Sequence, residues 1–180
     1  MKQSMERNTF KFYRKTINEI LNLKLTKNEI LVTLYILRNT SDNSKLIINN
    51  DVIAKLFDVS TDNIRKAKTL LLKTNIINND FSIKTDKTKT SNGTGFIQVP
   101  YSFFDFIIRN KRFRATELKV LTYLINLNKT GYIYLSSSHI SKTAHINRRT
   151  STATIKLFIK MDLLTDLKTK MEWIHYFVPR

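Results

Sequence analysis

Apolar and polar positions alternate at helical spacing through most of this chain, and they predict a mostly helical protein. The clearest stretch covers residues 53–73. There a short amphipathic run ends before Ser60, and a second run follows with Ile64, Ala67 and Leu71 on one face. Ser60 is a favourable N-cap, because its hydroxyl can accept a hydrogen bond from a backbone amide of the first helical turn. The stretch therefore predicts a helix-turn-helix.

The same pattern returns 87 residues later, at residues 140–160. Asn147 takes the place of Ser60 as the N-cap, and the helix that precedes the helix-turn-helix also repeats, at a spacing of 88. A repeat of this length indicates two copies of one supersecondary unit. We therefore expect two tandem domains, residues 1–95 and residues 96–180.

Short strands and hairpins are expected around each helix-turn-helix. In the first copy, residues 46–48 predict a strand, and residues 81–83 and 96–99 predict a hairpin around a connection rich in Gly, Asn and Thr. The second copy has a predicted strand over Tyr132–Leu135 and a closing hairpin over Leu167–Val178. The expected fold class is mostly α with small β-hairpins (α+β).

Several helix ends can be predicted from single residues. Thr26 and Glu29 have the spacing of a capping box, in which the hydroxyl and the carboxylate each accept a hydrogen bond from a backbone amide. Asn49 or Asn50 is expected to cap the first helix of the first helix-turn-helix. Asn75 follows the second helix and is expected in the left-handed conformation, which Asn tolerates better than most residues.

The chain is strongly basic, with a formal net charge of +17, 31 Lys and Arg residues and no Cys. Both halves share the excess, since residues 1–90 carry 17 Lys and Arg against 9 Asp and Glu, and residues 91–180 carry 14 against 5. A charge of this size favours a polyanionic partner. Without cysteine, an apolar membrane span or a secretory signal, the expected location is the cytoplasm.

Hydrogen-bond donors and cations occupy the outer face of the second helix in each helix-turn-helix. Such side chains suit the edges of DNA bases and the phosphate backbone, and arginine can bind guanine through two hydrogen bonds. Arg148 and Arg149, beside a helix N-terminus, are the sharpest candidates for reading bases, although phosphate contacts by both remain an alternative. The candidates are Thr61, Asn63, Arg65, Lys66 and Lys68 in the first copy, and Arg148, Arg149, Thr150, Thr152 and Lys156 in the second.

Three further groups of cations lie between the helical segments. The first is in the connection of the first hairpin, which is either a disordered surface loop or a basic wing that orders on the phosphate backbone. The second follows the apolar segment Tyr101–Ile108, which is expected to pack between the modules, and is either a solvated surface or a phosphate clamp. The third is at the tip of the closing hairpin. The groups are Lys84, Lys87 and Lys89, then Arg109, Lys111, Arg112 and Arg114, and finally Lys170.

Residue types with catalytic potential are few. The three histidines, His139, His145 and His175, have no carboxylate pair or metal-ligand cluster beside them in the sequence, and a structural or surface role is expected for each. Gly93 and Gly95 form a Gly-x-Gly pair, but no helix is predicted to follow it as a phosphate-binding loop requires. We therefore expect no enzymatic activity, no cofactor and no metal.

The order helix, strand, helix-turn-helix and hairpin, repeated twice, resembles tandem winged-helix proteins. The paired modules are similar to the replication initiator proteins of plasmids and phages. The segments FIQVPYSFF, at residues 96–104, and ELKVLTYLINLNKTGYIYLSSSHISKTAHINRRT, at residues 117–150, resemble many helix-turn-helix replication and regulatory proteins of low-GC bacteria. The resemblance implies two winged helices that insert their second helices into the major groove of double-stranded DNA.

The expected function is recognition of a two-part DNA site, most simply in replication initiation, by a pseudo-dimeric monomer or a homodimer that contacts replication or transcription proteins. The outer faces of the two copies differ, with Thr61, Asp62 and Asn63 against Arg148, Arg149 and Thr150, so the two half-sites should differ in sequence. Two alternatives remain open. One is a repressor that binds a promoter, and the other is a winged-helix interaction module without sequence-specific DNA binding.

Overall fold

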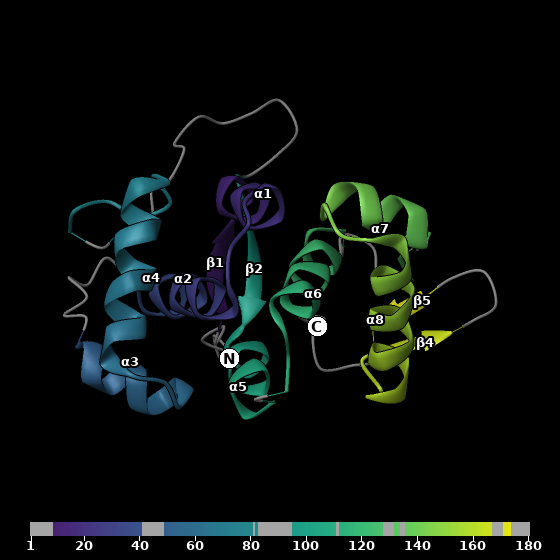
Figure 1. Cartoon of the computed structure of the whole chain (residues 1–180). Coiled ribbons are helices and arrows are strands. Elements are labelled where there is room, and N and C mark those ends of the chain that lie inside the picture. The colour runs from purple at the N-terminus through teal and green to yellow at the C-terminus, as the bar shows by residue number, and fades with distance from the viewer. Residues whose placement is uncertain are drawn as a thin grey trace, which may run out of the picture.

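The structure of the chain is a computed structural model that describes residues 9–40, 49–80, 82, 95–110, 112–127, 132–133, 136–166 and 171–173. These residues form eight helices and two small antiparallel sheets, β1–β2 near the middle of the molecule and β4–β5 at the edge beside α8 (Figure 1). This arrangement confirms the expected mostly helical α+β class. The first half contains β1 (Thr9–Tyr13), α1 (Arg14–Asn22), α2 (Lys27–Thr40), α3 (Asn50–Phe57) and α4 (Thr61–Lys73). The second contains β2 (Phe96–Pro100), α5 (Tyr101–Arg109), α6 (Ala115–Leu127), β3 (Tyr132–Ile133), α7 (Ser137–Thr143), α8 (Arg148–Lys160), β4 (Leu164–Asp166) and β5 (Met171–Trp173).

The predicted helix caps are present in the structure. Thr26 and Glu29 form both hydrogen bonds of the capping box at the start of α2, from the Thr26 amide to Glu29 Oε2 at 2.6 Å and from the Glu29 amide to Thr26 Oγ1 at 3.4 Å. Asn49, and not Asn50, caps α3 by accepting from two backbone amides. Ser60 caps α4, and Asn147 caps α8 by accepting from the Arg149 amide at 2.7 Å. These ends are decided by side chains within three residues of the helix start.

Left-handed backbone conformations mark the same places in both halves. Asp58 and Asn75 have φ angles of 58°, and His145 and Asp162 have φ angles of 50° and 54°. The second pair lies 87 residues after the first, at the turn of the helix-turn-helix and after its second helix. Asn75 is therefore left-handed as predicted, and the backbone of α3–α4 and of α7–α8 repeats at the spacing seen in the sequence.

The first sheet gives the strand at residues 96–100 a partner that the sequence did not predict. The described partner of β2 is β1, and the two strands pair in antiparallel register from Thr9 with Pro100 to Tyr13 with Phe96. The prediction had placed residues 81–83 in that position, and residues 81 and 83–94 lie outside the described residues. Phe10, Phe12 and Val99 are all buried, so the paired strands present one apolar face to the core.

The second sheet has the strand order β3-β5-β4. The closing hairpin starts at Leu164 and not at Leu167 as predicted, and Leu164 pairs with Trp173. Leu163 and Leu164 are buried, so their insertion into the core brings the start of the strand forward. Residues 46–48, 134–135, 167–170 and 174–180, which carried other strand predictions, lie outside the described residues.

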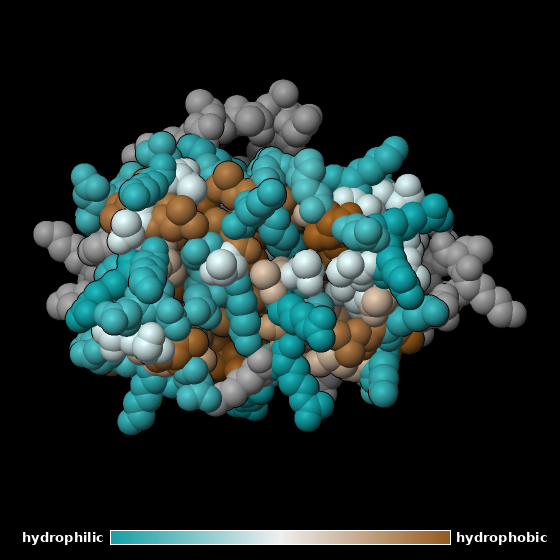
Figure 2. All heavy atoms as spheres, viewed as in Figure 1, coloured by the Kyte–Doolittle hydropathy of each residue, from teal (hydrophilic) through white to brown (hydrophobic). Residues whose placement is uncertain are grey.

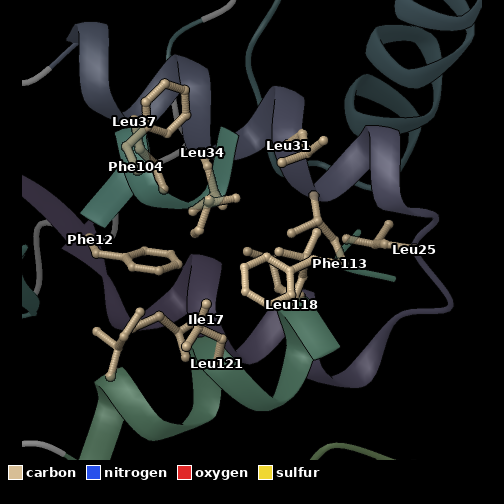
Figure 3. Close-up of a cluster of buried hydrophobic side chains, with 14 of the residues drawn as sticks. Phe12, Ile17, Leu25, Leu31, Leu34, Leu37, Phe104, Phe113, Leu118 and Leu121 are labelled. Atoms are coloured by element: carbon tan, nitrogen blue, oxygen red, sulfur yellow. The ribbon is translucent and has the colours of Figure 1, made fainter. Parts of the chain in front are cut away.

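The two halves share one hydrophobic core. Helix α1 packs against α6, and α5 packs against α2, so the first strand and helix of each half contact the other half. Figure 3 shows Phe12 and Ile17 of the first half beside Leu121 of the second, and Phe113 of the second beside Leu25 of the first. The segment Tyr101–Ile108 lies between the halves as expected, because α5 buries Phe103, Phe104 and Ile107.

Candidate nucleic-acid interface

Helix α4 exposes a mixed polar face. Asn63, Arg65 and Lys66 are exposed, as the sequence predicted. Arg65 Nη1 lies 2.9 Å from Asp62 Oδ1 in an exposed ion pair, so its charge is partly balanced within the helix. Thr61 is half-buried, and its hydroxyl donates to Asp51 Oδ1 at 2.9 Å, which ties the start of α4 to α3. The first two turns of α4 therefore offer Lys66 beside the Asn63 amide and the Arg65–Asp62 ion pair, and Lys73 is exposed at the end of the helix.

Lys68 was predicted on the outer face of α4, and the structure places it elsewhere. Its side chain is 8% exposed, and its Nζ donates to Asn50 Oδ1 at 2.9 Å. Burial lowers the pKa of Lys68 below its ordinary value. The residue lies four positions after Ile64 and three before Leu71, which is the spacing of the inner face. The helical period therefore predicts that Lys68 is buried, whereas its charge suggested an exposed position.

Helix α8 exposes a stronger positive surface. Arg148, Arg149 and Lys156 are exposed, and no acidic residue is present on the helix. Thr150 and Thr152 are half-buried, and the Thr152 hydroxyl donates to the Arg148 carbonyl at 3.0 Å. Two arginines in the first turn oppose the helix macrodipole, which favours negative charge at this end. Their placement therefore does not serve the stability of the helix.

A basic pocket lies where the α5–α6 connection meets the end of α8. It has a volume of about 440 Å³, and three cations line it: Arg109, Arg112 and Lys160. Phe113, Leu157, Met161 and Asn110 complete the lining, which contains no carboxylate. The sequence predicted the two arginines as a phosphate clamp but did not include Lys160. No pattern in the sequence links Lys160 to these arginines, because their proximity depends on how the end of α8 lies beside the α5–α6 connection.

The remaining predicted cations fall into two groups. Arg114 is exposed, and its backbone amide donates to Glu117 Oε2, so half of a capping box is kept at the start of α6. Five others lie outside the described residues, namely Lys84, Lys87, Lys89, Lys111 and Lys170.

Helices α4 and α8 lie at opposite ends of the molecule, with the β1–β2 sheet between them (Figure 1). Figure 2 shows the same side of the molecule as a surface of atoms. Hydrophilic side chains cover most of it, with smaller hydrophobic areas between them. The predicted residues of α4 and α8 therefore form two separate groups, one on each helix, and Arg109 and Arg112 line the pocket beside the end of α8.

The described residues contain no group of three His, Cys, Asp or Glu side chains that could hold a metal ion. His145 Nε2 lies 3.0 Å from Asn22 Oδ1, and the His139 ring packs beside Tyr123 with centroids 5.9 Å apart. Both contacts join structural elements, so these histidines have structural partners. No helix in the described part of the chain combines the length and apolarity that crossing a membrane requires.

The chain matches no protein-family model, no curated protein and no solved structure. The resemblance to tandem winged-helix initiators therefore stays a prediction. Any assignment of function has to come from the residues and their arrangement.

Proposed function

We propose that the chain is a non-enzymatic, double-stranded DNA-binding protein in which α4 and α8 are the recognition helices of two winged-helix modules. The observation that carries the proposal is the first turn of α8. There Arg148 and Arg149 are exposed on a helix that has no acidic residue and starts at the Asn147 cap. Placing two cations against the helix dipole costs stability, and contact with a polyanion recovers it.

The order of elements in the second half supports the winged-helix assignment. Helix α6 is followed by strand β3, the pair α7–α8 and the strands β4 and β5, with β3 at the edge of the three-stranded sheet. In such a module the second helix of the pair enters the major groove, and the hairpin that follows it contacts the adjacent backbone. The first half has the same helices at the same spacing.

The two modules would contribute unequally to binding. An exposed arginine can read guanine through two hydrogen bonds, and each such contact discriminates by about 1–3 kcal/mol. The second half offers Arg148 and Arg149 for this purpose, whereas Arg65 of the first half already pairs with Asp62. The net charge of +17 adds affinity that does not depend on sequence and falls with salt. We expect the half-site of α8 to dominate the binding energy.

Replication initiation at a plasmid or phage origin is the role most in keeping with two fused modules, and it places the protein in the cytoplasm with replication proteins as partners. A promoter-bound repressor requires the same interface, so the position of the site separates the two roles. A winged-helix interaction module is the third possibility, and it predicts DNA binding without sequence preference.

The test is selection of bound fragments from random and genomic duplex libraries at about physiological salt, followed by footprinting and affinity measurement. The variant Arg148→Ala should no longer protect one half-site in the footprint. Its affinity for the selected site should fall by about 5- to 150-fold, the equivalent of 1–3 kcal/mol. Arg65→Ala should lose the other half-site with a smaller effect. Lys142→Ala, an exposed cation on α7, is the matched control and should bind as the unmodified protein does.

Uniform, salt-labile binding to all duplexes, with equal effects of Arg148→Ala and Lys142→Ala, would contradict sequence-specific recognition and favour the interaction module. A defined site inside an origin would support initiation. A site over a promoter would support repression.

A further inference from the structure

Equivalent residues of the two halves are separated by a nearly constant number of positions in the sequence. The spacing is 87 between β1 and β2, between α1 and α5, and between α4 and α8, and it is 88 between Lys27 and Ala115 at the starts of α2 and α6. Each described element of the first half therefore has a counterpart in the second. The way in which counterparts contact each other reveals the symmetry that relates the halves.

The register of the β1–β2 sheet is that of a twofold rotation. At its centre Lys11 pairs with Gln98, its own counterpart 87 residues later. On one side Phe10 pairs with Val99, and on the other Phe12 pairs with Ile97, so each strand presents equivalent positions to its partner in reverse order. An antiparallel pair of equivalent strands with this register has a local twofold axis through its central pair.

Contacts between helices follow the same axis. Arg14 Nη1 on α1 donates to Asn126 Oδ1 on α6 at 2.9 Å. Their counterparts are Tyr101 on α5 and Arg38 on α2, and the Arg38 guanidinium lies 5.1 Å from the centre of the Tyr101 ring. Equivalent positions thus contact each other on both sides of the sheet, with different chemistry. The twofold relation therefore extends beyond the strands to the helices around them.

Helices α4 and α8 are exchanged by this rotation. Figure 1 shows them at opposite ends of the molecule with opposite directions, α4 running from the end beside α3 and α8 from the end beside α7. Duplex DNA has local twofold axes perpendicular to its length, and a protein with twofold symmetry matches a palindromic arrangement of half-sites. Two modules related by translation would instead match a direct repeat.

We propose that the two half-sites of the DNA are arranged as an imperfect inverted repeat, and not as a direct repeat. This inference rests on the proposed function and adds the polarity of the target. The repeat is imperfect because the exchanged helices carry different outer residues, with Asp62 and Asn63 of α4 in the positions of Arg149 and Thr150 of α8. The rotation sets the orientation of the half-sites, and these side chains set their sequences.

Synthetic duplexes can test the orientation directly. The two half-sites identified by selection are placed in inverted, everted and direct order at every spacing across about one helical turn, and affinity is measured by fluorescence anisotropy. The inverted order should bind at least about tenfold more tightly than the best direct order, because the wrong orientation removes the base contacts of one half-site.

A second experiment determines the orientation of α4 and α8 on the bound DNA by attaching a probe to the protein. The chain has no cysteine, so Lys73→Cys and Lys160→Cys each provide a single attachment point for a DNA-cleaving iron chelate. These exposed residues are counterparts at the last positions of α4 and α8. Twofold symmetry predicts that the two variants cleave the DNA at positions related by the twofold axis through the centre of the site.

The possible failures are distinguishable. Tighter binding to a direct repeat, or cleavage on the same side of both half-sites, would overturn the inverted arrangement and leave DNA recognition intact. Equal binding to all duplexes, including those without half-sites, would remove the proposed function itself.

Discussion

Lys119 is a buried cation that joins the two halves of the chain. It lies on α6 with 7% of its surface exposed, and its Nζ donates to the carbonyls of Leu21 and Leu23 at 3.1 and 2.6 Å. These carbonyls belong to the end of α1, where the helix macrodipole favours a positive charge. Burial lowers the pKa of Lys119, and the two hydrogen bonds offset the cost of removing the amine from water.

The variant Lys119→Met keeps most of the side-chain stem and removes the donor. It should lower the free energy of unfolding by about 1–3 kcal/mol, because the Leu21 and Leu23 carbonyls lose their partner in a buried place. Urea denaturation measures the change, and Lys142→Met, at an exposed position, is the control. Equal stability of the two variants would show that the bonds to α1 contribute nothing.

At the scale of the element, α8 combines a favourable cap with an unfavourable charge distribution. Asn147 satisfies the Arg149 amide, yet the first turn carries two arginines and no acid. The corresponding turn of α4 carries Asp62, which suits the positive end of the helix dipole. The structure therefore predicts opposite effects of charge reversal on the folding and on the binding of α8.

Arg149→Glu should raise the free energy of unfolding by about 0.3–1 kcal/mol and weaken DNA binding more than any neutral substitution on the same helix. Thermal denaturation and fluorescence anisotropy with the selected site measure the two effects. Lys156→Glu makes the same change in net charge farther along α8, so it should weaken binding without stabilising the fold. A loss of stability in Arg149→Glu would mean that the arginine has a structural role.

At the scale of the whole molecule, the shared core makes the halves interdependent. Phe113 packs with its ring centroid 5.8 Å from that of Phe106 and 6.1 Å from that of Phe158. Figure 3 also shows it beside Leu25 and Leu31 of the first half. A side chain that contacts elements of both halves couples their stability, even though the repeat suggests two units.

Phe113→Ala should therefore destabilise both halves together, by about 3–5 kcal/mol. Hydrogen exchange should show that amides of α2 and of α8 lose protection to the same extent, in one cooperative transition. Val52→Ala, at an exposed apolar position, is the control and should change little. Two separate unfolding transitions, with only α6–α8 affected, would instead establish independent domains.

Predictions from the sequence succeeded where the cause is local. The caps at Thr26, Ser60 and Asn147 and the left-handed Asn75 depend on side chains a few positions away, and the structure shows each of them. Lys68 was wrongly predicted on the exposed face of α4, because its charge was given more weight than its position in the helical period. Pairing of β2 could not be foreseen, since a strand of five residues is compatible with many partners and its choice depends on the whole core.

The sequence by itself determined the helical class, the 87-residue repeat, the helix ends and the exposed arginines of α8, because periodicity and capping act within a few residues. Only the tertiary structure decided that β1 pairs with β2, that α1 packs against α6 of the other half, and that Lys119 and Lys160 lie beside distant segments. A repeat in sequence is compatible with translation or with rotation. The antiparallel register of β1 with β2, centred on Lys11 and its counterpart Gln98, is that of a rotation, and with it comes the relative direction of α4 and α8.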